Sequence, residues 1–214
     1  LRRSSAHGLL ASGKSRVRLS HCHVQSTQAA GVEARGRAVV RLHGCRIHRC
    51  QRSGVFASAF SEVHAEFCNV FDNAFAAVES AAEAEASMDR CWMHHGKRGG
   101  ALALGRSWLR LNGCEIYSNA MAGVDVRGSA RASVTASRVA EGRASGVHVS
   151  EGGTVEMTDN DVTANQLCGV ELEGRAATLV ARRNRLTGNG GGALSLPDPQ
   201  LSGQVPPPLL DDNV

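Results

Sequence analysis

The chain has 214 residues and a formal charge of +4, and only 4% of its residues are aromatic. This length fits one domain of ordinary size. Sparse aromatic content excludes a core built on large rings, and the scattered Lys and Arg residues argue against a nucleic-acid partner. No apolar stretch reaches the roughly 18 residues that a membrane-spanning helix needs, so no membrane insertion is predicted.

Glycine followed by a small aliphatic residue recurs every 23 residues, as in Gly31–Val32 and Gly123–Val124. Counting each glycine as position zero, aliphatic residues recur at positions one and three, nine and eleven, and sixteen. These bursts of alternation are typical of short strands with one buried face, and they leave no room for a helix. Glycine at position five and Asn or Gly at position nineteen, such as Asn119, indicate corners that need positive φ angles.

The repeat therefore predicts an all-β fold, a right-handed parallel β-helix of about eight coils with three short strands per coil. Neighbouring coils would lie ~4.8 Å apart. We expect this β-helix to span residues 1–196, with one residue inserted near Leu179 in the last coil. Residues 197–214 are Pro-rich and are expected to form a C-terminal tail or cap, because proline lacks the donor that a sheet requires.

A column of cysteines follows the same period and continues as Ser137 and Asn160. We interpret it as a buried slot that asparagine often fills in β-helices, occupied here by a small thiol. Disulfides and a zinc site are the alternatives, but stacked side chains have parallel Cα–Cβ vectors and no Cys-x-x-Cys pair occurs. No metal or other cofactor is predicted, and unbridged cysteines favour an intracellular, reducing compartment, with secretion as the alternative. The column contains Cys22, Cys45, Cys68, Cys91 and Cys114.

The outward positions of the first strand offer one candidate catalytic set. Asp125, His148 and Glu171 are consecutive in one column, and Arg127 lies two residues beyond Asp125. An acid, an imidazole and a second acid in line suit general acid–base chemistry on a polysaccharide. The alternative is that exposed strand positions are polar because they contact water. The uniform repeat leaves almost no room for long loops that would wall an active site, so we favour no catalytic residues and lean against an enzyme.

The outward positions of the third strand offer a different surface. They combine exposed aromatic residues with basic residues, a combination that is common in protein–protein contacts and also suits stacking on sugar rings. Chance clustering on a solvated face is the alternative. The predicted partner-binding residues are Arg46, His48, Phe71, Trp92, His94 and Tyr117.

The segments at residues 115–124 and 160–170 carry the pattern Asn-x-x-x-Gly-Val before the first strand and Asn-x-Val in the third. They resemble the parallel β-helix repeats of the pectin-lyase-like superfamily, over roughly residues 7–196. The likeness is greatest to the carbohydrate-binding and sugar-hydrolase domain of β-helical F-box and Shc-SH2-binding proteins. The resemblance implies the β-helix fold and, from the F-box relatives, recognition of protein substrates. It is weaker for pectate lyases, whose acidic catalytic clusters have no match here.

We therefore predict a non-catalytic protein-interaction scaffold within a larger protein or complex, with protein partners and a carbohydrate as a further candidate ligand. One alternative is a polysaccharide-directed lyase, hydrolase or epimerase that uses the outward face of the first strand. The other is a purely structural spacer.

Overall fold

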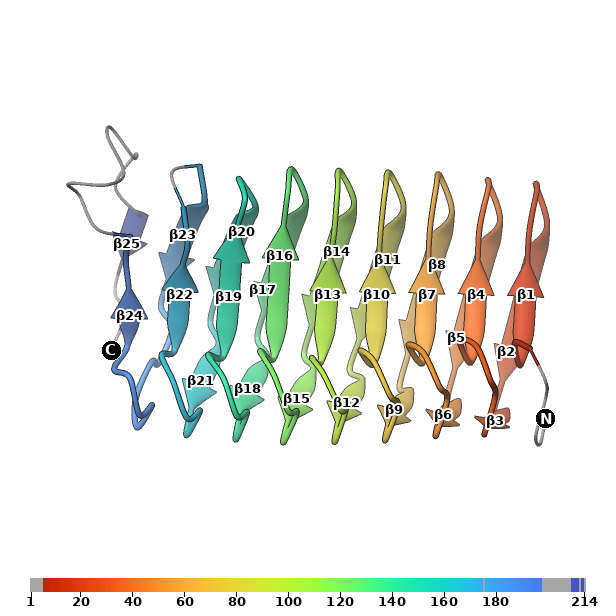
Figure 1. The fold of residues 1–214 in the computed structure, drawn as a ribbon, viewed down its shortest axis with the longest axis horizontal. Coiled ribbons are helices and arrows are strands. Elements are labelled where there is room, and N and C mark those ends of the chain that lie inside the picture. Colours follow the sequence, from red (N-terminus) through yellow and green to blue (C-terminus); the bar gives the residue numbers. More distant parts are fainter. Residues whose placement is uncertain (1–5, 175, 198–208, 212, 214) are drawn as a thin grey trace.

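A computed structural model describes residues 6–174, 176–197, 209–211 and 213. They form a solenoid in which three parallel sheets run along the long axis, with the N-terminal coil at one end and the last strands at the other (Figure 1). Each of these strand residues pairs with the residue at the same position in the next coil. Val32 pairs with Val55, and Val55 pairs with Val78. The predicted right-handed parallel β-helix, with about eight coils and three strands per coil, is confirmed.

The strands of a coil follow one another along the chain, and each joins a different sheet. The first sheet contains β1 (Leu9–Ala11), β4 (Val32–Ala34), β7 (Val55–Ala57), β10 (Val78–Ser80), β13 (Ala101–Ala103), β16 (Val124–Arg127), β19 (Val147–Ser150), β22 (Val170–Leu172) and β24 (Leu194–Ser195). The second contains β2 (Arg16–Ser20), β5 (Val39–His43), β8 (Glu62–Glu66), β11 (Glu85–Asp89), β14 (Trp108–Asn112), β17 (Arg131–Thr135), β20 (Thr154–Thr158), β23 (Thr178–Arg182) and β25 (Leu209–Asp211). The third contains β3 (His23–Gln25), β6 (Arg46–His48), β9 (Asn69–Phe71), β12 (Trp92–His94), β15 (Glu115–Tyr117), β18 (Arg138–Ala140) and β21 (Asp161–Thr163).

The register shifts by one residue in the last coil. Val149 pairs with Leu172, whereas Thr154 pairs with Thr178, so the inserted residue lies between Leu172 and Thr178 and slightly before Leu179. Strand β25 pairs with β23, which places residues 209–211 of the expected tail on the end of the second sheet. The remainder of that tail, residues 198–208, 212 and 214, lies outside the described residues.

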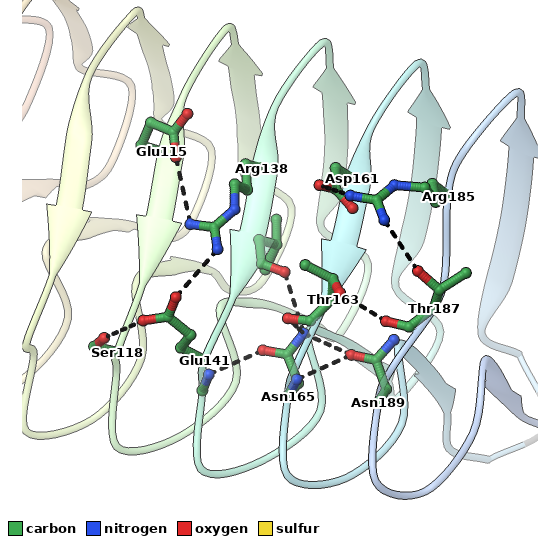
Figure 2. Close-up of polar contacts among 12 residues, drawn as sticks. Glu115, Ser118, Arg138, Glu141, Asp161, Thr163, Asn165, Arg185, Thr187 and Asn189 are labelled. Atoms are coloured by element: carbon green, nitrogen blue, oxygen red, sulfur yellow. Dashed lines mark hydrogen bonds and ion pairs between the residues drawn. The ribbon is translucent and has the colours of Figure 1, made fainter.

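The corners differ in one respect from the prediction. Gly105 has a φ of +71° at position five, as expected, but Asn119 is fully buried and the positive φ of 54° belongs to Ser118 before it. The amide of Asn119 is used inside the coil stack instead: its Oδ1 accepts from the Gly96 N–H at 2.9 Å and its Nδ2 donates to the Met93 carbonyl at 3.1 Å. Asparagine side chains at position nineteen thus bond between coils, with the Gly96 and Gly142 N–H groups as donors where the position is glycine, and Figure 2 shows the contact between Asn165 and Asn189.

The side chains of the cysteine column also bond between coils. The Sγ atom of Cys68 accepts from the Cys45 N–H at 3.4 Å, and further along the Oδ1 of Asn160 accepts from the Ser137 N–H at 2.9 Å. Thiol, hydroxyl and amide groups therefore fill one slot and satisfy one backbone donor per coil, as the interpretation of the column requires. Burial raises the pKa of the Cys114 thiol to about 11, so this thiol stays protonated and unreactive at neutral pH.

Asn119→Ala is expected to lower the free energy of unfolding by about 2 kcal/mol or more, because it leaves two buried backbone groups without partners. The matched control is Asn112→Ala on the exposed edge of β14, where the amide bonds only to Asp89 among the described contacts. Chemical denaturation of both variants measures the difference. Equal losses would contradict this structural role of Asn119.

Candidate functional site

The candidate catalytic residues lie on neighbouring strands of the first sheet. Asp125 on β16 is the register partner of His148 on β19, which is in turn the partner of Glu171 on β22. The small aliphatic neighbours Val124 and Val126 are fully buried, so Asp125 between them must face outward. Despite facing outward, Asp125 is only 8% exposed, because the side chains around it cover its carboxylate.

A connected set of charged groups surrounds His148. Its Nδ1 lies 3.0 Å from Asp125 Oδ1, and its Nε2 lies 3.1 Å from Glu173 Oε2. Arg127 donates to both oxygens of Asp125, from Nε at 3.0 Å and from Nη2 at 2.6 Å. Asp125 therefore orients the imidazole on one side and is itself fixed by a bidentate guanidinium on the other.

This arrangement shifts both pKa values. The hydrogen bond to Asp125, opposed by burial, raises the pKa of His148 above its ordinary value of 6.5. Burial alone would raise the pKa of Asp125, but the hydrogen bonds from His148 and Arg127 outweigh burial and lower it. Asp125 is thus ionised at neutral pH, and His148 can hold or release a proton near it.

Glu171 does not join this set, contrary to the prediction of a continuous line of three groups. Its Oε2 accepts from Ser145 Oγ at 2.6 Å instead. The same spacing of 26 residues joins Ser53 to Glu79 at 2.5 Å and His7 to Glu33 at 3.1 Å. Each glutamate in this column is therefore bound by the polar side chain 26 residues before it, whereas Asp125 has Gly99 at that position.

The sequence analysis missed Glu173, which takes the place expected for Glu171. Glu173 follows β22 and its side chain is 71% exposed, while that of His148 is 16% exposed. Glu173 lies two residues beyond Glu171, just as Arg127 lies two residues beyond Asp125. The spacing that identified Arg127 as a candidate could therefore also have identified Glu173.

A pocket of about 140 Å³ is lined by Asp125 and Arg127 but not by His148, whose Nδ1 lies 3.0 Å from Asp125 Oδ1. Leu102 also lines it, as do Phe75 and Arg98 from the turns that precede strands of the first sheet. The Arg98 guanidinium lies 4.7 Å from the centre of the Phe75 ring. A larger groove, of about 580 Å³, lies on the second sheet and does not contain the candidate catalytic residues.

The predicted partner-binding residues of the third sheet form a stack of rings rather than an open patch. Phe71 stacks on His48 with ring centres 4.5 Å apart and on His94 at 5.1 Å, and His94 stacks on Tyr117 at 4.7 Å. The register places residues of one column at the spacing of stacked rings, so the ring faces cover one another. His48 is 5% exposed, which corrects its expected exposure, whereas Trp92 is 42% exposed and Arg46, two coils away from it, is also exposed.

Beyond Tyr117 the third-sheet face is occupied by ion pairs (Figure 2). Arg138 contacts Glu141 at 3.1 Å and Glu115 at 3.8 Å, and Arg185 contacts Asp161 at 2.5 Å. The predicted partner face is therefore bounded by charged groups that are already paired. A contact between this face and a protein partner stays a prediction.

Two further properties concern the described residues only. They include no group of three or more His, Cys, Asp or Glu side chains arranged to hold a metal ion. They also include no helix long and apolar enough to cross a membrane.

Asp125→Asn is expected to lower the pKa of His148, because it removes the carboxylate that favours the imidazolium. The raised pKa of His148 adds stability that is complete below about 6.5 and is lost as the pH rises through the raised value. The lowered pKa of Asp125 adds stability that is lost as the pH falls through the lowered value. NMR titration of the His148 ring protons measures the shift, and Glu156→Gln on the second sheet is the control. An unchanged titration in Asp125→Asn would contradict the pairing.

The chain is similar in fold to solved carbohydrate-active enzymes. The periplasmic alginate epimerase AlgG is 16% identical with a TM-score of 0.70, over 94% of this chain and 59% of that one. The A-module of mannuronan C-5 epimerase AlgE4 from Azotobacter vinelandii is 14% identical with a TM-score of 0.73, over 92% and 59%. Pectate lyase Pel9A is 13% identical with a TM-score of 0.52, over 82% and 60%. The chain thus spans less than two thirds of each structure, and no curated protein matches it in sequence.

These neighbours correct the preference for a non-catalytic scaffold and the leaning against an enzyme, because they are polysaccharide-acting enzymes. The argument against catalysis was that a uniform repeat leaves no room for walls around a site. The pocket at Asp125 is lined by side chains of the short turns, among them Phe75 and Arg98, so a hollow forms here without a long loop.

The sequence also matches a family model directly. The model described as the right-handed β-helix region matches residues 1–110 and 76–200, which together cover most of the chain. This match agrees with the three parallel sheets and with the predicted likeness to the pectin-lyase-like superfamily. The chain belongs to the right-handed β-helix family.

Proposed function

We propose that the chain acts on an acidic polysaccharide through the face of the first sheet, with His148 as the group that transfers a proton. The observation that carries the proposal is the Asp125–His148 pair beside a pocket that contains two arginines. The enzymes of similar fold support it, since their names give alginate, mannuronan and pectate as the polymers that they act on.

His148 has the environment of a general acid–base group. Asp125 holds Nδ1 and so directs Nε2 away from the sheet, as the orienting acid does in other acid–histidine pairs. Glu173 contacts Nε2, but its exposed side chain can turn into solvent and free that nitrogen for substrate. The hydrogen bond to Asp125 raises the pKa of His148 above its ordinary value, so the carboxylate stabilises the imidazolium that forms when Nε2 takes up a proton.

The reaction class that fits is removal of a proton from a carbon next to a carboxyl group. His148 Nε2 would accept the proton, and the electron pair would move onto the carboxyl group. Return of a proton from water to the opposite face gives the epimer. Loss of the neighbouring glycosidic oxygen, which takes up a proton from water as it leaves, gives the lyase product, and His148 releases its own proton to solvent in both cases. Hydrolysis by two carboxyl groups fits less well, because Asp125 is bound by Arg127 and Glu171 by Ser145.

Arg98 is positioned to recognise the carboxylate of the substrate. Arg127 is already bound to Asp125, so Arg98 is the second cation lining the pocket and has no carboxylate partner among the described residues. Arg98→Gln is expected to raise KM for an acidic polymer about tenfold while kcat changes less, because a charge-assisted hydrogen bond is lost. Arg143→Gln, on a turn two coils away, is the control, and an unchanged KM in Arg98→Gln would contradict this role.

The proposed function is tested by incubating the chain with pectate, alginate and a neutral glucan. The proposal predicts that one acidic polymer is converted, with an unsaturated end group or an inverted carbon visible by NMR, and that the neutral glucan is unchanged. New reducing ends without unsaturation would indicate hydrolysis and would contradict the proton-abstraction mechanism. No conversion of any acidic polymer would contradict the function itself.

A further inference from the structure

A groove on the second sheet was not singled out by any sequence motif. It has a volume of about 580 Å³ and crosses strands β2, β5, β8 and β11, near the N-terminal end of the solenoid. Arginines line it on β2 and β5 and acids line it on β8 and β11, with a histidine on each of β5 and β8: Arg18, Arg41, Glu66, Asp89, His43 and His64.

The cationic half of the groove holds like charges in register. Arg18 on β2 and Arg41 on β5 are direct partners, and Arg16 lines the adjoining pocket with them. None of the three lies within ion-pair distance of an acid in the described part of the chain. Like charges directly opposite one another on neighbouring strands are unfavourable, so an anion that bridged them would be bound by relief of this repulsion.

The acidic half of the groove is internally bonded. Asp89 contacts Arg90 at 2.8 Å and accepts from Asn112 Nδ2 at 2.6 Å, and Glu66 lies 3.5 Å from His43. These acids are therefore not available to neutralise Arg18 and Arg41. Their remaining oxygen lone pairs can still accept hydrogen bonds from a ligand that carries hydroxyl groups.

Aromatic side chains follow the edge of the groove where the second sheet turns toward the third. His43 packs edge-on against His21 at 5.5 Å and against Phe67 at 5.6 Å between ring centres. Phe67 is 39% exposed, and the Arg90 guanidinium lies 4.4 Å from its ring centre. The rim thus presents flat, partly exposed surfaces beside the charged floor.

We propose that this groove is a second binding surface for an acidic polysaccharide, with Arg18 and Arg41 binding its carboxylates. The identity of the ligand rests on the proposed function, whereas the anion preference rests on the groove alone. A sugar chain carries both carboxylates for the arginines and hydroxyl donors for Glu66 and Asp89. The backbone of DNA carries phosphates for the arginines but no hydroxyl groups to donate to Glu66 and Asp89.

The test is titration calorimetry of the chain with an oligogalacturonate, a neutral malto-oligosaccharide and a DNA oligonucleotide. All measurements use the His148→Asn background as well, so that turnover does not obscure binding. The proposal predicts that the double variant Arg18→Gln with Arg41→Gln binds oligogalacturonate on the order of tenfold more weakly than the parent. Added salt should reduce this difference in affinity between the parent and the double variant. Arg131→Gln, an exposed arginine of the same sheet outside the groove, is expected to bind as the parent does.

The outcomes separate this inference from the proposed function. Removing the repulsion should leave the thermal stability of the double variant unchanged or slightly higher, so lost binding cannot be attributed to misfolding. Turnover with no effect of the double variant on affinity overturns the second surface only. Arginine-dependent binding without turnover overturns the proposed function only. Equal binding of the neutral sugar, or tighter binding of DNA, also overturns the second surface.

Discussion

His148→Asn is expected to reduce turnover of the acidic polysaccharide by about 10²–10⁴-fold, the usual contribution of a general acid–base group. Asparagine can keep a hydrogen bond to Asp125 but cannot take up a proton near neutral pH. Asp125 also keeps its two bonds from Arg127, so no buried charge loses its partner. The loss should therefore appear in kcat, with thermal stability close to that of the unaltered chain.

The matched control is His95→Asn on the third sheet. His95 is exposed and has a φ of 54°, a conformation that asparagine tolerates well. It is expected to leave turnover unchanged. A His148→Asn variant that retained full kcat would show that this imidazole does not carry the proton, whatever the substrate.

Gly100→Ala is expected to lower the free energy of unfolding, because the added methyl group has no room. A Cβ at Gly100 would lie 2.4 Å from Ile116 Cγ2 and 2.6 Å from the Gly123 carbonyl oxygen. Overpacking of this kind costs about 1–3 kcal/mol and sometimes more. Chemical denaturation measures the effect on the free energy of unfolding.

The chain itself contains the exception that supports this expectation. Position zero holds alanine once, at Ala77, and in that coil position sixteen holds Met93 instead of valine or isoleucine. Methionine has no branch at Cβ, so it leaves room for the alanine methyl group. Ile116→Met is therefore expected to recover part of the loss in Gly100→Ala, with a coupling energy of about 1 kcal/mol.

Two outcomes would contradict this explanation. The first is a Gly100→Ala variant no less stable than Ala77→Gly, which should cost only about 0.5–1 kcal/mol. The second is strict additivity of Gly100→Ala and Ile116→Met. In either case the glycine column would be explained by backbone conformation rather than by contact with position sixteen.

The period of the sequence predicts most of the fold because a parallel register converts sequence spacing into contact. Once residues 23 apart are known to be partners, Asp125 must lie beside His148 and Phe71 beside His94. The period does not predict how a side chain turns within its column. Glu171 turns toward Ser145, 26 residues before it, rather than toward His148, 23 residues before it. Glu173 contacts His148 in its place.

The exposure of a side chain was harder to predict than the residues that it pairs with. His48 occupies an outward position, yet its ring is covered by the rings on either side of it. The presence of hollows on the surface was also not predicted, because side chains of short turns and neighbouring strands can form a hollow without a long loop. Whether Arg18 and Arg41 in the second-sheet groove are left without an acid partner depends on which acids are bonded to other residues. The repeat pattern does not contain that information.

The central claim is that the first-sheet face at His148 exchanges a proton with a carbon of an acidic polysaccharide. The most direct measurement is NMR of the polymer after incubation in D₂O with the unaltered chain and with His148→Asn. The proposed mechanism predicts that the unaltered chain introduces deuterium at the carbon next to the carboxyl group or removes that hydrogen in an unsaturated product, and that His148→Asn does neither. Deuterium uptake that is equal in the two proteins, or conversion of the polymer with that carbon–hydrogen bond intact, would contradict it.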